Sequence, residues 1–289
     1  MPVVVSGFTF LRDAVSNGYP FEESIRSLLP IVDEYIVAVG ISGDDTLERV
    51  RAIGDPKIRV IETSWNEKMQ DRGYVYGQQK MIAQFNCNGD WAFYLEGDEV
   101  LHEDDLQNIR STMDRYRDDP EVEALYFDFL HFYGTPSQTG IAGYRRAPRI
   151  IKNSIRSIAP DGLFFVILDG NKRGRYPRAR YAGASIYHYG HCRKTEFTNR
   201  KLRQVGKFWG AKHEEFTTYG KIDVAELRPF VGSHPRIMAD WLNNSAELTF
   251  EPDESYRLTR RDLRNRLRFW VEERFGLEIS KKHYKDLGH

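Results

Sequence analysis

A ten-residue segment, DWAFYLEGDE at residues 90–99, carries the side chains best suited to chemistry. Its apolar part, WAFYL, has the composition and length of a buried strand. Glu96, Asp98 and Glu99 follow directly, and carboxylates at the end of a buried strand are costly unless a positive charge meets them. A Mg²⁺ or Mn²⁺ ion would supply that charge, and Gly97 would let a ligand approach the backbone. The segment therefore predicts a metal site that could neutralise a diphosphate; the alternative is a polar turn between a strand and a helix.

The composition of the 289 residues limits the classes of protein to consider. Lys and Arg total 42, as do Asp and Glu, so no overall charge favours nucleic acid or another strongly anionic partner. Cys87 and Cys192 are too few for a disulfide framework and suit a reducing compartment. The start, MPVVVSGFTF, lacks the features of a signal peptide, and apolar runs such as 163–168 are too short to span a membrane. We expect a cytoplasmic protein, soluble or at most peripheral at the inner face of a membrane.

Strand and helix patterns alternate over the first hundred residues. The predicted strands are 3–6, 35–39, 58–61 and 91–95, and the predicted helices are 20–30, 44–53 and 75–85. Strands separated by helices of this length imply right-handed βαβ units and a parallel sheet. Ligands bind such sheets beyond the carboxyl ends of the strands. Both the acids at 96–99 and the loop 40–46 follow strands in this way.

The pattern changes beyond residue 120. Further strands are predicted at 124–133, 149–151, 163–168 and 184–189, without helices between them, and from about Thr195 the pattern is mostly helical. Strands in this arrangement indicate an antiparallel or mixed addition to the sheet. We therefore expect an α/β fold, with a mixed, mainly parallel sheet flanked by helices in a domain at 1–190 and a mostly helical extension at 191–289. Dinucleotide-binding and P-loop motifs are absent from the sequence.

Two segments in this order carry a family resemblance. Residues 37–46, VAVGISGDDT, and residues 89–99, GDWAFYLEGDE, resemble the second strand with its acidic loop and the acid-x-acid segment of family 2 glycosyltransferases, which have the GT-A fold. The resemblance covers about residues 3–106, and Tyr187-His-Tyr-Gly190 is similar to the end of the catalytic domain in some bacterial members. This chain departs from the family in having Glu96 as its first acid. It also has Val39 or Gly40 where an acid usually holds the nucleoside.

The resemblance implies a metal-dependent transferase that uses a nucleotide-diphosphate sugar with Mn²⁺ or Mg²⁺. Asp98 would hold the metal, and Glu96 would bind ribose or assist with the metal. His188 would be a further metal ligand or a donor to the diphosphate; the alternative is a hydrogen-bonded histidine between aromatic residues.

Five other residues are candidates to bind the nucleotide because they lie at strand ends or beside the metal segment: Gly7, Gly40, Asp44, Arg72 and Lys80. Asp44 could replace the missing nucleoside acid, or could simply cap a helix. Arg72 and Lys80 could contact phosphates, or could be solvated helix charges.

An inverting transfer also needs a carboxylate to deprotonate the acceptor hydroxyl. Asp161, in the Pro-Asp-Gly turn before a predicted strand, is our first candidate, although that tripeptide is common in turns. Asp128 is the second, because it lies within an aromatic strand where an unpaired acid is costly.

The predicted function is therefore transfer of a sugar to a glycan or lipid-linked acceptor, in bacterial cell-surface glycan or glycolipid assembly. The alternatives are a nucleotidyltransferase that makes sugar nucleotides, and a degenerate carbohydrate-binding protein.

A basic stretch near the C-terminus has two interpretations. Its arginines alternate with an apolar stripe formed by Leu263, Leu267 and Trp270. We expect this stripe to pack into the core beneath a solvated face; the alternative is contact with an anionic membrane surface or a lipid diphosphate.

Overall fold

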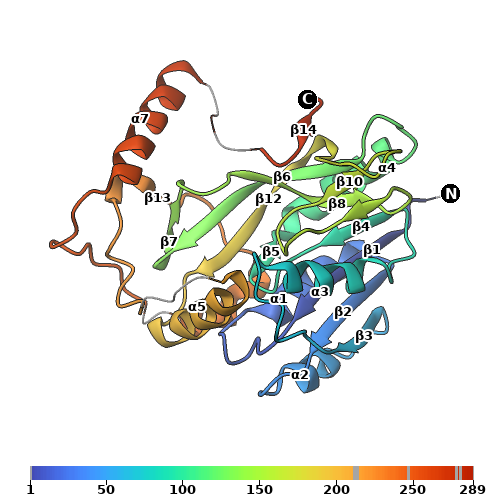
Figure 1. The fold of residues 1–289 in the computed structure, drawn as a ribbon, viewed down its shortest axis with the longest axis horizontal. Helices are drawn as coiled ribbons and strands as arrows, with labels where there is room; N and C mark the ends of the chain where they lie inside the picture. The colour runs from blue at the N-terminus through green and yellow to red at the C-terminus, as the bar shows by residue number, and fades with distance from the viewer. Residues whose placement is uncertain (1, 211–214, 246–247, 277–278, 280–281, 289) are drawn as a thin grey trace.

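The computed structural model describes residues 2–210, 215–245, 248–276, 279 and 282–288. Its first part is the predicted βαβ arrangement (Figure 1). The strands are β1 (Val5–Leu11), β2 (Glu34–Gly40), β3 (Ile58–Thr63) and β4 (Trp91–Tyr94), and the helices are α1 (Phe21–Leu28), α2 (Thr46–Ala52) and α3 (Tyr74–Gln84). β1 pairs in parallel with both β2 and β4, and β2 pairs in parallel with β3.

Later strands extend this sheet on the β4 side. They are β5 (Glu99–Leu101), β6 (Ala124–Tyr133), β7 (Thr135–Gly140), β8 (Arg146–Lys152) and β12 (Arg178–His191). β8 joins β4 and β6 by antiparallel pairing, and β12 pairs in parallel with β6 and antiparallel with β5. The predicted mixed sheet flanked by helices is therefore confirmed. A small second sheet contains β9 (Ser157–Ile158), β10 (Val166–Leu168) and β11 (Gly174–Arg175).

Alternating side chains of the strands supply two cores. On one face, α1 and α4 (Leu106–Tyr116) pack against a cluster that includes Trp91 and Phe93. On the other face, α3 packs against Phe8 and Tyr94. Because side chains alternate between the faces of a strand, the fully apolar run of β4 fills both cores. This double burial holds the end of β4, where the acids begin, in a fixed position.

The C-terminal region is only partly helical, contrary to our expectation. Its helices are α5 (Thr195–Trp209), α6 (Ala239–Asn244) and α7 (Arg260–Phe275), and its short strands are β13 (Leu227–Pro229) and β14 (Lys285–Asp286). β13 pairs with β7 and β14 pairs with β12, so both strands belong to the main sheet. The division at residue 190 stays a prediction. No helix in the part of the chain that the structure describes is long and apolar enough to cross a membrane.

Several element boundaries differ from those predicted. β1 runs through Gly7 instead of ending there, because a Cβ on Gly7 would lie 2.7 Å from the ring of Tyr35, so the missing side chain serves packing. The strand predicted at 163–168 shortens to β10, since the backbone N–H groups of Leu163 and Phe164 bind Asp161 in a turn. Helix α4 was not predicted: Ile109 and Met113 are its fully buried apolar residues, too few for a clear periodic pattern.

Candidate functional site

Three neighbouring strands bring the predicted metal ligands together. β12 lies between β5 and β6, so that His188 is in register with Glu99 on one side and with His131 on the other. The chain passes from β4 to β5 through Glu96 and Asp98 beside this position. The ligand atoms of Glu96, Asp98 and His188 lie within 4.8 Å of one another, and His188 Nε2 is 3.6 Å from Asp98 Oδ1. Two carboxylates and an imidazole form a donor set that fits Mn²⁺ or Mg²⁺.

A second histidine fixes the orientation of His188. His131 Nε2 lies 2.7 Å from the carbonyl oxygen of Tyr144, which can only accept, so this nitrogen carries a proton. Burial, and then the charges of His188 and Arg149, lower the pKa of His131 to about 3, so its ring is neutral and its Nδ1 accepts. The Nδ1 atoms of His131 and His188 are 2.7 Å apart, and His188 therefore donates. Nε2 of His188 is then the ring nitrogen that faces Asp98, and it is the atom that would bind a metal in place of a proton.

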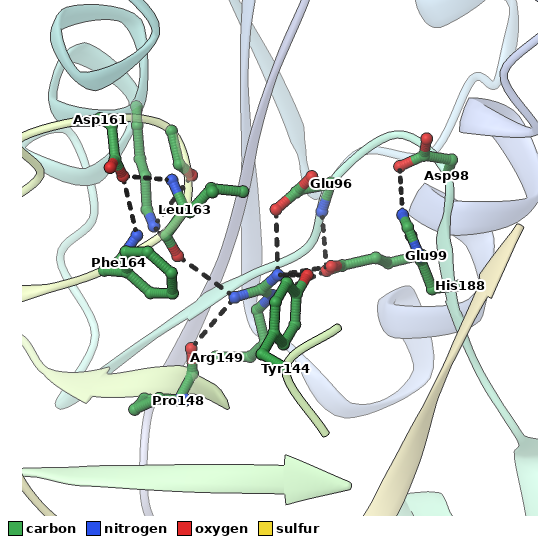
Figure 2. Close-up of polar contacts among 12 residues, drawn as sticks. Glu96, Asp98, Glu99, Tyr144, Pro148, Arg149, Asp161, Leu163, Phe164 and His188 are labelled. Carbon is green, nitrogen blue, oxygen red and sulfur yellow. Dashed lines mark hydrogen bonds and ion pairs between the residues drawn. The ribbon is translucent and has the colours of Figure 1, made fainter. Parts of the chain in front are cut away.

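Arg149, from β8, binds two acids of this segment, Glu99 and the predicted metal ligand Glu96 (Figure 2). Its Nε and Nη2 donate to Glu99 at 2.8 and 2.5 Å, and Nη2 also donates to Glu96 at 2.9 Å. The side chains of Arg149 and Glu99 are 1% and 0% exposed. The positive charge expected beside these acids is therefore supplied to Glu99 by Arg149, with which it forms a buried ion pair.

Two cationic side chains of the protein also bind Asp98. Its Oδ2 accepts from Arg193 at 2.8 Å and from Lys201, on α5, at 3.0 Å. Although burial raises it, these cations and His188 hold the pKa of Asp98 well below its usual value. Burial and the neighbouring acids Glu99 and Asp98 raise the pKa of Glu96 to about 7. Asp98 is thus ionised at neutral pH, whereas Glu96 titrates there.

The cluster opens into a cavity of about 350 Å³ with aromatic walls. Its lining includes Glu96, Asp98 and His188, the rings of Phe10, Tyr19, Trp65, Tyr76, Tyr94 and Tyr144, and Lys201, Gln204, Val205 and Trp209 from α5. Trp65 Nε1, on a residue of this lining, is a buried donor with no hydrogen-bond partner among the described residues. Aromatic walls and an unpartnered donor suit a ligand with ring faces and polar groups, such as a sugar or a nucleoside.

The structure separates the predicted nucleotide-binding residues. Gly40 lies beside the cavity, since a Cβ there would be 2.4 Å from Trp65 Nε1, and its lack of a side chain makes room for Trp65. Gly7 instead faces the core, as described above. Asp44 accepts hydrogen bonds from Thr46 and from the backbone N–H of Ser16, so it joins the start of α2 to the loop after β1. This placement favours the structural alternative for Asp44.

The two predicted phosphate-binding cations also lie outside the cavity lining. The side chain of Arg72 is 90% exposed, near Asp71. Lys80 is fully buried, and its Nζ donates to the carbonyl oxygens of Gly162 and Leu163, each at 3.3 Å. Both interpretations of Lys80, as a phosphate contact and as a solvated charge, are therefore corrected. Lys80 instead holds the backbone of a segment that lines the cavity.

The two candidate bases are placed differently. Asp161 directly precedes Gly162 in the cavity lining, and its Oδ1 accepts from the backbone N–H groups of Leu163 and Phe164 (Figure 2). Asp128 lines a separate cavity of about 450 Å³ and binds Arg146 and Tyr181, at 2.7 Å each. The structure therefore does not bring Asp128 to the metal cluster.

Sequence reasoning missed four residues of the site. Arg149 carried a signal, a lone arginine between apolar residues of a strand, which indicates a buried acidic partner. His131, Arg193 and Lys201 carried none, because they lie 33, 95 and 103 residues from Asp98 in the chain and only the fold brings them near.

Comparisons with known proteins leave the family open. No protein-family model matches the chain, and no curated protein matches it. A structure of S. aureus TarS is 14% identical, with a TM-score of 0.40 over 73% of this chain and 67% of that one. A TarS structure with UDP has a TM-score of 0.36 at 14% identity over 52% of this chain, which spans 47% of its length.

Two further solved structures contain a metal and a nucleotide. Glucosyl-3-phosphoglycerate synthase from Mycobacterium tuberculosis, with Mn²⁺, UDP and phosphoglyceric acid, is 17% identical, with a TM-score of 0.31 over 45% of this chain and 43% of that one. Mannosyltransferase PcManGT from Pyrobaculum calidifontis, with GDP-Man and Mn²⁺, is 17% identical, with a TM-score of 0.33 over 46% and 36%. Similarity at this level carries no argument about activity, and the fold rests on the strand pairing described above.

Proposed function

We propose that this protein is a metal-dependent glycosyltransferase of the GT-A type that uses a nucleotide-diphosphate sugar. The observation that carries the proposal is the convergence of Glu96, Asp98 and His188 at the mouth of an aromatic cavity, beyond the carboxyl end of β4. A site at this edge of a parallel sheet is where such folds bind ligands. The resemblance of residues 37–46 and 89–99 to family 2 glycosyltransferases supports the same function.

In this proposal, different side chains of the site have different roles. Glu96, Asp98 and His188 would hold Mn²⁺ or Mg²⁺, which neutralises the charge of the leaving diphosphate when bound. Trp65 and Tyr76 offer ring faces to the nucleoside or the sugar. Asp161 takes the proton of the acceptor hydroxyl, so that the transfer proceeds with inversion. By analogy with the family, the acceptor is a glycan or a lipid-linked saccharide of the cell surface, and transfer takes place in the cytoplasm.

Nucleotide binding gives the first test. We would measure the melting temperature with UDP, GDP, CDP or dTDP, each with Mn²⁺, Mg²⁺ or EDTA, because a ligand of the native state raises apparent stability. One diphosphate should stabilise the protein only with metal, and Asp98→Asn should abolish that shift. Asp118→Asn, at an exposed acid outside the cavity, is the matched control. A shift that persists in Asp98→Asn would refute the metal site.

The role of Asp161 is tested by two substitutions. Asparagine can still accept the hydrogen bonds from the amides of Leu163 and Phe164, but it cannot take a proton, whereas alanine can do neither. Asp161→Asn should bind donor nucleotide normally and lower turnover by about 10²- to 10⁴-fold. If Asp161→Asn is as active as the wild type and only Asp161→Ala is impaired, Asp161 serves the turn and is not the base.

One observation favours a second candidate, a degenerate carbohydrate-binding site without metal. Arg193 and Lys201 already neutralise Asp98. Lys201→Met separates the candidates, because Lys201 competes with a metal for Asp98 Oδ2. In a metal site, apparent Mn²⁺ affinity, measured by calorimetry, should rise several-fold in this variant. In the second candidate, Mn²⁺ does not bind in either protein.

A further inference from the structure

Helix α7 (Arg260–Phe275) is the feature that the proposed function leaves unexplained. Figure 1 shows it at the periphery of the molecule, beyond β7 and β13. The helix is well formed: Thr259 and Asp262 make a capping box at its start, and Gly276, with φ of 65°, ends it. The residues where the helix begins and ends are therefore set by local capping interactions.

The inner face of α7 is mainly polar. Its buried residues are Asp262, Asn265, Phe269 and Glu272. Asn265 donates to Glu226 at 2.5 Å, Arg266 binds Asp223 at 2.6 and 2.8 Å, and Glu272 binds Arg145. Hydrogen bonds and ion pairs hold the helix to the body, and Phe269 is its buried apolar residue among those that the structure describes.

The outer face of α7 is apolar, contrary to the expectation that its stripe packs into the core. Leu263, Leu267 and Trp270 are 56%, 63% and 59% exposed, and their spacing places them on one side of the helix. Exposed Phe275 extends this surface, with its ring 6.3 Å from that of Trp270. A surface helix in water normally turns such a stripe inward. The reversed arrangement leaves an exposed apolar surface of the kind that marks a contact with another protein or with a membrane.

Charged residues on the same side specify the chemistry of that contact. Arg260, Arg264 and Arg274 lie three, four or seven residues from members of the apolar stripe, and all three are exposed. They have no hydrogen bond or ion pair to another residue of the described chain. Glu273, at the margin, is paired with Arg228 at 2.9 Å. The face is thus positively charged as well as apolar.

We propose that the outer face of α7 binds the surface of a bilayer that contains anionic lipid. The leucines and Trp270 enter the boundary between headgroups and acyl chains, and the guanidinium groups bind lipid phosphates. A second copy of the chain fits less well, because a two-fold interface would place the same unpaired arginines against each other. The proposal does not depend on transferase activity.

Vesicle sedimentation tests the proposal with the full chain and no nucleotide or metal. We would compare phosphatidylcholine vesicles with and without about 30 mol% phosphatidylglycerol. The protein should bind the anionic vesicles, and binding should weaken as NaCl rises from about 50 to about 500 mM. The variant Leu263→Ser/Leu267→Ser/Trp270→Ser should bind more than about tenfold more weakly. Arg260→Gln/Arg264→Gln/Arg274→Gln should lose on the order of 100-fold.

Phe85→Ser is the matched control, since Phe85 is 64% exposed just after α3. It should bind vesicles like the wild type. Fluorescence quenching by brominated lipid gives a second measurement that needs no disruptive variant: the wild type should be quenched more than Trp270→Phe. Binding that is unchanged in the apolar triple variant, or absent at low salt, would overturn the proposal. So would self-association of the wild type in sedimentation equilibrium that the apolar triple variant abolishes.

Discussion

Two regions contain the acids that follow β4, and they differ in how the negative charge is neutralised. Glu99 is paired with Arg149, and both are almost completely buried, so this region is closed to ligands. Asp98, one residue earlier, faces His188 and the aromatic cavity, and one of its cations, Lys201, is 25% exposed. Of these two adjacent carboxylates, Glu99 has a structural role and Asp98 is open to a ligand. The difference is that the counterion of Glu99 is buried with it, whereas a counterion of Asp98 is partly exposed.

The largest expected effect comes from breaking the closed region. Arg149→Met should lower the free energy of unfolding by about 3–5 kcal/mol, because it leaves the Glu99 carboxylate buried without its cation. Urea denaturation measures this loss, and the double variant Arg149→Met/Glu99→Gln should recover part of it. Lys201→Met, in the open region around Asp98, should lower the free energy of unfolding by less than about 1 kcal/mol, since Asp98 keeps its ion pair with Arg193. Equal losses in the two regions would contradict the distinction.

Substitution of His131 tests the open region alone. His131→Phe keeps the ring shape but removes the acceptor of the His188 Nδ1 proton, so His188 loses its fixed tautomer. Mn²⁺ affinity, measured by calorimetry or electron paramagnetic resonance, should fall about 10- to 100-fold. His131→Asn, whose amide oxygen can accept that proton, should recover part of the affinity. His234→Phe, at a histidine outside the cavity lining, should leave it unchanged.

The buried amine of Lys80 should make the free energy of unfolding depend on pH, and this effect is smaller than that of Arg149→Met. Burial, and then the charge of Arg149, lower the pKa of Lys80 to about 7, whereas it is 10.5 in the unfolded chain. Between these values the unfolded state binds one more proton, so Lys80 makes the protein more stable as pH rises from 7 towards 10. Urea denaturation at pH 7 and 9 should show a gain in wild type of about 1–2 kcal/mol that Lys80→Met lacks. The same pH dependence in both proteins would exclude this role.

The sequence predicted elements well where one local pattern decides them. The strands and helices from β1 to β4 have clear apolar runs and breaks, and β6 was predicted to the residue. The predicted metal ligands came from a contiguous motif and a Tyr-His-Tyr strand end, and the fold brings them together. The counterions could not be predicted, because pairing between distant strands decides which cation lies beside which acid. The face of α7 was misjudged for a related reason: periodicity reveals a stripe but not which side is covered.

The order of the acids and their cationic partners along the chain also bears on how the protein folds during synthesis. Glu99 precedes Arg149 by 50 residues, and Asp98 precedes Lys201 by 103. A ribosome makes the parallel strands first, so their acids emerge before the arginines and the lysine that neutralise them. A nascent chain that ends after α4 must keep these carboxylates in water, which leaves the end of β4 unpacked. We therefore expect the end of β4 to become fully packed only when β8 and α5 have been synthesised.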